Sequence, residues 1–275
     1  MLHVQPIDSF DLAGLEPYRT MRRTLEHRQQ GIFVAEGEKV VRRLLKTDFT
    51  VVSVLLAEEW FQSFEPLLKS RPETITAFVA AKEVIEELTG FSMYQGVLAV
   101  GKVPAPLSLE TILNGSAKPN LFAAVDGLTS AENLGVLVRN CAAFGVQALI
   151  VGETSSSPYL RRAVRGSMGT IFKLPMVETA NLARTLREMS GRQIRCVAAH
   201  PHTDRRLLTE VNLTKDCCLV FGSEGFGISP DVLAACDEAV AIPMQTGVDS
   251  LNVGSAAAVF LYEVSRQRGG GLARK

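Results

Sequence analysis

The sequence predicts an α/β fold in two domains, with a parallel sheet in the second. Three observations lead to this prediction. With 275 residues and 47% hydrophobic content, the chain is long for one core and comfortable for two. Short apolar runs that end at glycine or proline alternate with segments of helical periodicity. A stretch with three prolines at 102–119 separates two such regions and is the expected linker, so the predicted domains are 1–101 and 120–275.

The N-terminal region predicts a small α/β domain. A basic helical segment, YRTMRRTLEHRQQ, covers 18–30, and a solvated helix face explains its charges as simply as an RNA contact does. Apolar runs predict strands at 32–35, 51–57 and 97–100, and Val40, Val41 and Leu44 recur at helical spacing between the first two. Trp60, Phe61 and Phe64 could stack on bases, but an apolar helix stripe packed on the sheet is favoured.

The second region repeats strand and helix in turn. Strands are expected at 121–125, 149–152 and 195–199, and helices from about 134 to 144 and at 182–189. Two further strands, 219–221 and 239–242, each lead into a loop that contains glycine, at the edge where α/β sheets bind ligands. A last helix over 251–267 starts with small residues, and Ser250 is its expected N-cap.

Three segments of the second region resemble the motifs of one enzyme family. They are VDGLTSAENLGVLVRNCAAFG at 125–145, GSEGFGIS at 222–229 and IPMQTGVDSLNVGSAAAVFLYE at 242–263. In this order they resemble the three motifs of the SpoU (TrmH-type) RNA 2′-O-ribose methyltransferases of the SPOUT class. The resemblance implies a trefoil-knotted α/β catalytic domain, S-adenosylmethionine as cofactor, a homodimer and an N-terminal α/β/α RNA-recognition domain.

The resemblance also assigns site residues. Arg139 is implied for catalysis, with Asn133 and Glu224 as orienting partners, Ser250 near the ribose and Asn252 at the helix start. The cofactor pocket is implied at Gly222, Ile242, Met244 and Leu251. Because a guanidinium stays protonated in proteins, stabilising negative charge on oxygen is the expected role of Arg139, rather than that of a base. If Asn133 lies in the helix, the two residues do not share one helix face, since six residues turn the helix by about 240°.

Substrate RNA is expected at two basic places. The resemblance implies Arg22, Arg23 and Glu36 in the N-terminal domain. Arg161, Arg162 and Arg165 lie between Thr154 and Lys173 without a local acidic residue, and with Ser167 they are suitable phosphate ligands, although acidic residues from elsewhere could neutralise them.

Two departures from the family pattern affect the third motif. Between Met244 and Ser250 the chain reads QTGVD, where the family usually places a glycine after one variable residue. Gly254 and Ser255 replace a more common pair of a small polar and a β-branched residue. Cofactor contacts and substrate choice are the expectations that these departures weaken.

Composition excludes several other classes. The formal net charge is zero, so an RNA-binding surface has to be local. Five cysteines lack CxxC spacing and predict buried thiols in a reducing compartment. No metal site is expected, because His200 and His202 have no third ligand nearby. No apolar run approaches the ~18 residues that cross a bilayer, and the start does not resemble a signal peptide, so a cytoplasmic enzyme without membrane contact is expected.

The alternatives are an RNA-binding assembly factor that keeps the fold without catalysis, and methylation of transfer RNA in place of ribosomal RNA. A nucleotide-dependent oxidoreductase is disfavoured, because GSEGFG lacks the GxGxxG order.

Overall fold

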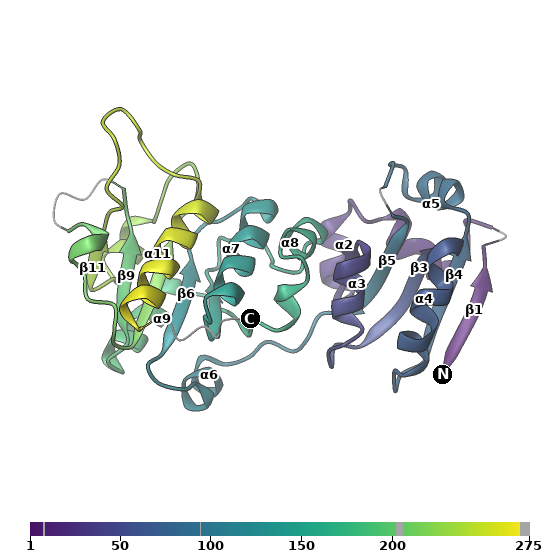
Figure 1. Cartoon of the computed structure of the whole chain (residues 1–275), viewed down its shortest axis with the longest axis horizontal. Helices are drawn as coiled ribbons and strands as arrows, with labels where there is room; N and C mark the ends of the chain where they lie inside the picture. The colour runs from purple at the N-terminus through teal and green to yellow at the C-terminus, as the bar shows by residue number, and fades with distance from the viewer. Residues whose placement is uncertain (8, 94, 202–205, 270–275) are drawn as a thin grey trace. The chain divides into compact units, whose positions relative to one another are not determined.

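The structure is a computed structural model that describes residues 1–7, 9–93, 95–201 and 206–269 (Figure 1). It divides into two compact units. The first unit comprises Met1–Ala105 and Pro158–Phe172, and the second comprises Pro106–Ser157 and Lys173–Lys275. The break near residue 105 falls inside the linker expected from the sequence. The membership of 158–172 in the first unit differs from the expected boundary of 120–275.

The first unit is built on a mixed five-stranded sheet with the order β1-β4-β3-β5-β2. Its strands are β1 (Leu2–Pro6), β2 (Ile32–Glu36), β3 (Val51–Ala57), β4 (Ile75–Ala80) and β5 (Val97–Lys102). The first, fourth and third strands run parallel, whereas β5 is antiparallel to both β3 and β2. Three of the five strands were predicted from their apolar runs, and β1 and β4 were not.

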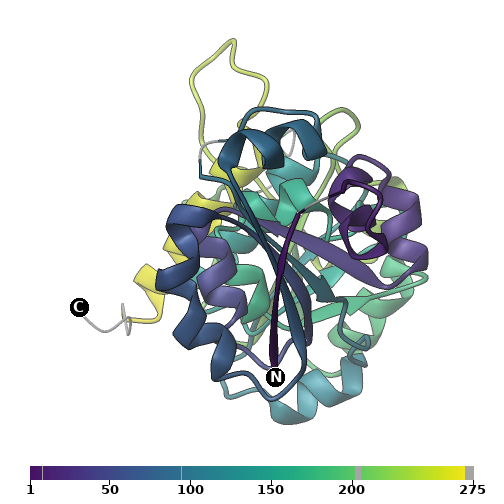
Figure 2. The same ribbon diagram turned by 90° about the vertical axis from the view of Figure 1, so that its right-hand side faces the viewer.

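Helices cover both faces of this sheet, as Figure 2 shows with this unit toward the viewer. They are η1 (Ala13–Leu15), α1 (Glu16–Arg19), α2 (Thr24–Gln29), α3 (Glu38–Leu44), α4 (Glu58–Lys69), α5 (Lys82–Thr89), α8 (Arg161–Gly166) and η2 (Thr170–Phe172). The predicted basic helix at 18–30 is two short helices, because residues 20–23 break the helical pattern. Phe64 on α4 is fully buried, so the expectation that the aromatic residues of this helix pack against the sheet is confirmed for it.

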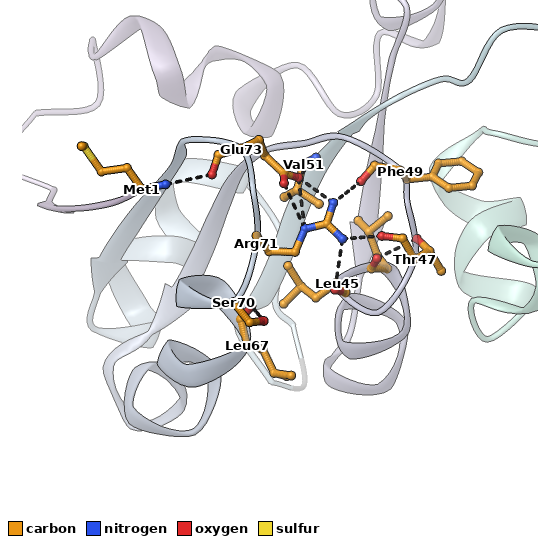
Figure 3. Close-up of polar contacts among 10 residues, drawn as sticks. Met1, Leu45, Thr47, Phe49, Val51, Leu67, Ser70, Arg71 and Glu73 are labelled. Atoms are coloured by element: carbon orange, nitrogen blue, oxygen red, sulfur yellow. Dashed lines mark hydrogen bonds and ion pairs between the residues drawn. The ribbon is translucent and has the colours of Figure 1, made fainter.

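A buried arginine ties together the loops at one end of the first unit (Figure 3). The Arg71 guanidinium donates hydrogen bonds to the carbonyl oxygens of Leu45, Thr47 and Phe49, and it pairs with the Glu73 carboxylate. Only 9% of the Arg71 side chain is exposed. A buried cation needs such partners, and the planar fork of arginine satisfies all of them at once.

Glu73 makes the stability of the first unit sensitive to acid. Burial raises the pKa of its carboxyl group, but hydrogen bonds from Arg71 and from the Val51 N–H outweigh burial, so the pKa is lowered. The stabilisation is therefore complete above the unfolded-state pKa of about 4.3 and is lost as the pH falls through the lower folded-state value. We expect Glu73→Gln to lower the free energy of unfolding at pH 7, and we expect this difference from wild type to shrink as the pH falls below the unfolded-state value.

Urea unfolding followed by the fluorescence of Trp60, the single tryptophan of the chain, reports on this unit. Glu65→Gln, which removes a half-buried carboxylate paired with Lys69, is the matched control. A difference between wild type and Glu73→Gln that stays constant between pH 7 and pH 3 would contradict the assignment.

The second unit contains a fully parallel six-stranded sheet with the order β11-β9-β10-β6-β7-β8. The strands are β6 (Leu121–Val125), β7 (Ala148–Val151), β8 (Met176–Glu178), β9 (Arg195–Ala199), β10 (Cys217–Phe221) and β11 (Glu238–Val240). The helices are α6 (Leu109–Gly115), α7 (Ala131–Ala143), α9 (Leu182–Gly191), η3 (Leu208–Glu210), α10 (Pro230–Leu233) and α11 (Val253–Gln267). The predicted parallel α/β architecture of this domain is confirmed. The trefoil knot stays a prediction.

The five cysteines are free thiols, as expected, and four of them are buried. Burial raises the pKa of Cys217 to about 11, so this thiol is protonated near neutral pH. In the described part of the chain, no helix is both long and apolar enough to cross a membrane. The same residues contain no cluster of three or more potential metal ligands. His202 lies outside the described residues.

Candidate active site

A cavity of about 550 Å³ lies at the carboxyl edge of the second sheet. Parallel strands end at a common edge, so the loops after β9, β10 and β11 meet there with the start of α11. Seven of the residues predicted from the sequence line this cavity: Gly222, Glu224, Ile242, Met244, Ser250, Leu251 and Asn252. All four residues expected for the cofactor are among them.

The turn after β10 is held rigidly at both ends. Ser223 and Gly227 exchange two backbone hydrogen bonds of 2.9 and 3.0 Å. A Cβ atom at Gly222 would lie 2.1 Å from the carbonyl carbon of Gly227. Only glycine therefore allows the two sides of the turn to approach this closely. Beyond the turn, the buried carboxylate of Asp126, at the end of β6, accepts a 2.6 Å hydrogen bond from the Ser229 N–H.

Three predicted side chains form one hydrogen-bonded row at the cavity. The Asn133 amide nitrogen donates to Glu224 Oε1 at 2.6 Å, and the Asn252 amide nitrogen donates to Asn133 Oδ1 at 3.0 Å. Asn252 Oδ1 then accepts the Gly254 N–H at 2.9 Å. Because an ionised carboxylate only accepts and a backbone N–H only donates, the two ends determine the orientation of both amides. This places the Glu224 carboxylate at one defined position in the loop.

Asn252, rather than Ser250, is the N-cap of α11, because its side chain accepts the Gly254 N–H. The predicted cap at Ser250 was wrong by two residues. Ser250 is left as an exposed residue of the cavity wall, which agrees with a role toward a ligand rather than in the helix.

Arg139 does not line the cavity of the chain to which it belongs. Helix α7 begins at Ala131 with Ser130 as N-cap, so Asn133 belongs to the helix and not to the preceding loop. Asn133 therefore faces the row of amides, whereas Arg139 lies about 240° further around the helix. Arg139 is exposed and has no hydrogen-bond or ion-pair partner among the described residues. Its expected contact with the other site residues is not seen within one chain.

The residues expected to meet RNA divide into two groups, all in the first unit. Arg22, Arg23, Arg162 and Arg165 are exposed. Glu36 is buried and pairs with both Arg161 and Arg165, and Arg161 also lies over the Phe91 ring. Ser167 is fully buried, donates to the Val164 carbonyl and accepts the Gly169 N–H. Ion pairing of Glu36 with Arg161 and burial of Ser167 engage these three side chains inside the first unit, and their contact with RNA stays a prediction.

The departure at Gly254 has a packing reason. A Cβ atom at this position would lie 2.6 Å from Val136 Cγ1 on α7. The Gly254 carbonyl also accepts a 2.7 Å hydrogen bond from the Asn140 side chain, so α7 and α11 approach closely here. Glycine at 254 is thus matched to the β-branched residue at 136.

We expect Gly254→Ser to lower the free energy of unfolding by about 1–3 kcal/mol, because valine has few rotamers with which to yield. Adding Val136→Ala should recover most of that loss. Chemical denaturation of the wild type, both single variants and the double variant measures the coupling. Strictly additive effects would show that the two residues do not clash.

The cavity suits a nucleoside-sized ligand such as S-adenosylmethionine. Its volume lies within the ~300–1,000 Å³ range of small-molecule sites. Ile242, Met244 and Leu251 contribute apolar side chains to its wall, and Glu224, Ser250 and Asn252 contribute polar ones beside the glycine-containing turn. These residues fit a ligand with one planar apolar end and one polar end.

Comparison with known proteins assigns this arrangement to a family. The profile of the SpoU rRNA Methylase family matches residues 120–262, which include all six strands of the second sheet and every residue that lines the cavity. The chain belongs to the SpoU rRNA methylase family. An uncharacterised tRNA/rRNA methyltransferase of Mycobacterium tuberculosis is 31% identical over 96% of this chain and 93% of its own.

Further relatives are similar over most of the chain. The 23S rRNA (guanosine-2′-O-)-methyltransferase of Pectobacterium atrosepticum is 31% identical over 85% of this chain and 98% of its own. The SpoU methyltransferase AviRb of Streptomyces viridochromogenes, solved with S-adenosylmethionine, has 26% identity and a TM-score of 0.82, over 94% of this chain and 100% of its own. The predictions of a SpoU-type methyltransferase and of S-adenosylmethionine as its cofactor are confirmed.

Two residues of the SpoU site escaped the sequence reasoning. Asp126 accepts the hydrogen bond that holds the chain after the β10 turn. It could have been noticed in the sequence as an acidic residue directly after an apolar strand, because a buried carboxylate requires a partner. Phe226 lines the cavity and yet is 99% exposed. In a turn that contains glycine, no periodicity in the sequence shows whether a phenylalanine is exposed or buried.

Proposed function

We propose that this SpoU protein methylates the 2′-hydroxyl of a ribose in ribosomal RNA. The observation that carries the proposal is the Asn133–Glu224–Asn252 row beside the cavity. Glu224 and Asn252 belong to the cavity wall, and Asn133 joins them by one hydrogen bond to each. The name of the Pectobacterium relative supports ribosomal RNA and ribose as the substrate class, since the match includes most of the first unit.

The chemistry defines what the protein's residues have to do. S-adenosylmethionine, when bound, supplies an electrophilic methyl group. A ribose hydroxyl is a poor nucleophile, so the protein has to align it and to stabilise negative charge on its oxygen. Glu224 Oε2 is not used in the amide row and can accept a hydrogen bond from that hydroxyl. Ser250 in the cavity wall can contact the same sugar.

We further propose that the first unit recruits RNA through its exposed arginines. Arg22 and Arg23 adjoin helix α2, whose Leu25 is 67% exposed, so this surface is not covered by the unit's own core. Arginine is a suitable ligand for phosphate at such a surface. The free thiols and the RNA substrate together favour the cytoplasm as the location.

A homodimer is the third part of the proposal. Helices α7 and α11 pack side by side (Figure 1), and their outer sides expose Val136, Arg139, Val259 and Tyr262. We call this surface the α7–α11 face. Exposed apolar residues on neighbouring helices are typical of subunit contacts. Tyr262→Asp should convert a dimer to a monomer in sedimentation experiments, whereas a wild-type monomer would contradict this part.

Transfer of tritiated methyl groups from S-adenosylmethionine to RNA tests the main proposal. Ribosomal and transfer RNA from cells that lack the gene are offered separately, and ribose methylation is then mapped by primer extension. We expect incorporation into ribosomal RNA at one ribose. Incorporation only into transfer RNA would show that transfer RNA, and not ribosomal RNA, is the substrate. No incorporation into either RNA, despite cofactor binding, would favour an RNA-binding factor without catalysis.

A further inference from the structure

We infer that Phe226 stacks on the nucleobase of the nucleotide whose ribose is methylated. The inference rests on the proposed function and adds a positioning residue that touches the base rather than the reacting sugar. It starts from the unusually high solvent exposure of the Phe226 side chain. Phe226 is 99% exposed, more than any other large apolar side chain of the described residues.

The exposure of Phe226 is imposed by the turn that carries it. The Phe226 N–H donates to Ser223 Oγ at 3.1 Å, and the Ser223 hydroxyl contacts the Gly227 carbonyl at 3.3 Å. With the two Ser223–Gly227 backbone hydrogen bonds, these contacts hold the turn closed. Gly227 has φ +68°, a conformation that glycine adopts without strain. The turn therefore presents the ring outward, away from the core of its unit.

The position of the ring indicates that a nucleobase binds against it. Phe226 follows Glu224 by two residues, and Glu224 is the end of the amide row. Phe226, Met244 and Leu251 all line the same cavity, and Leu251 is 39% exposed, so the polar site has an apolar rim. A ribose held at Glu224 carries its base a few atoms away. An aromatic face is a sequence-tolerant platform for any base.

The test compares two RNAs and three proteins. One RNA is a short transcript that contains the mapped target nucleotide, and the other is the same RNA with an abasic ribose at that position, which keeps the 2′-hydroxyl and the phosphates. The proteins are wild type, Phe226→Ala and Phe226→Trp. Single-turnover methyl transfer gives kcat/KM for each pair, and calorimetry gives the affinity for S-adenosylmethionine.

If Phe226 stacks on the base, loss of the base should lower kcat/KM of the wild type by about tenfold, and Phe226→Ala should cause a similar loss on intact RNA. Phe226→Ala should show almost no further loss on abasic RNA, because the stacking partner is already absent. Phe226→Trp should restore most of the rate. Cofactor affinity and thermal stability should stay unchanged in both variants, since the ring is almost fully exposed.

Three results would overturn the inference while the proposed function stands. The first is the same abasic penalty in wild type and Phe226→Ala. The second is a normal rate for Phe226→Ala on intact RNA. The third is dissociation of a dimer by Phe226→Ala, which would make the ring a subunit contact. A wild type that methylates no RNA would instead overturn the proposed function itself.

Discussion

Alanine at position 139 is expected to lower the rate of methyl transfer by about 100- to 1,000-fold, because it removes the cation that stabilises developing charge on the ribose oxygen. The affinity for S-adenosylmethionine should remain nearly unchanged, since Arg139 does not line the cavity. Thermal stability should also be preserved, because the exposed guanidinium has no partner among the described residues. Single-turnover kinetics and calorimetry measure the two effects separately.

Two control variants sharpen this result. Arg187→Ala removes an exposed arginine from α9, outside the cavity, and should leave activity intact. Arg139→Lys keeps the charge but loses the planar fork, so it should recover only part of the rate. Full activity of Arg139→Ala would show that the residue belongs to the surface and has no catalytic role.

Mixing two inactive proteins tests where Arg139 acts. Since Arg139 lies outside the cavity of its own chain and on the α7–α11 face, we expect it to complete the site of a partner subunit. Co-expressed Arg139→Ala and Glu224→Ala chains should then regain part of the activity, because mixed dimers contain one site with both residues intact. An inactive mixture of confirmed heterodimers would place both residues in the site of one chain.

Aspartate in place of Asn252 is expected to lower methyl transfer on the order of 100-fold, with little loss of stability. The carboxylate still accepts the Gly254 N–H, so the cap of α11 is kept. It cannot donate to Asn133 Oδ1, however, and Asn133 would then stand between two carboxylates. The amide row loses its determined direction, and Glu224 loses its fixed position.

Asn252→Ala separates capping from the amide row. It removes both functions, so it should lose the same activity and in addition about 1 kcal/mol of stability. Denaturant unfolding and single-turnover rates on both variants distinguish the two effects. Near-normal activity of Asn252→Asp would show that the row is structural and that Glu224 needs no support from it.

Local patterns were sufficient for most of the second sheet. Leu121–Val125 and Arg195–Ala199 are strands with the predicted bounds, because short apolar runs flanked by polar residues are typical of a buried parallel sheet. The edge strand β1 escaped prediction. Its residues alternate weakly and remain largely exposed, and only pairing with β4 makes them a strand.

The sequence predicted which loop residues lie together at the carboxyl edge of the second sheet. Gly222, Glu224 and Asn252 were named correctly as neighbours of one cavity. The ion pair of Glu36 with Arg161 and the burial of Ser167 were not predictable, because charged and hydroxyl groups look equally available in a sequence until burial and pairing are known. Arg161 lies 125 residues from Glu36, and no local pattern predicts that ion pair.

The order of residues alone established the family, the parallel α/β catalytic region and the glycine-rich turns that a nucleoside ligand requires, because backbone conformation and apolar periodicity are local properties. Folding in three dimensions decided which polar groups meet. It aligned Asn133, Glu224 and Asn252 into one hydrogen-bonded row, turned Arg139 to the outer side of α7 and left Phe226 exposed. Those outcomes depend on helix phase and on contacts between distant segments, which only the packed chain determines.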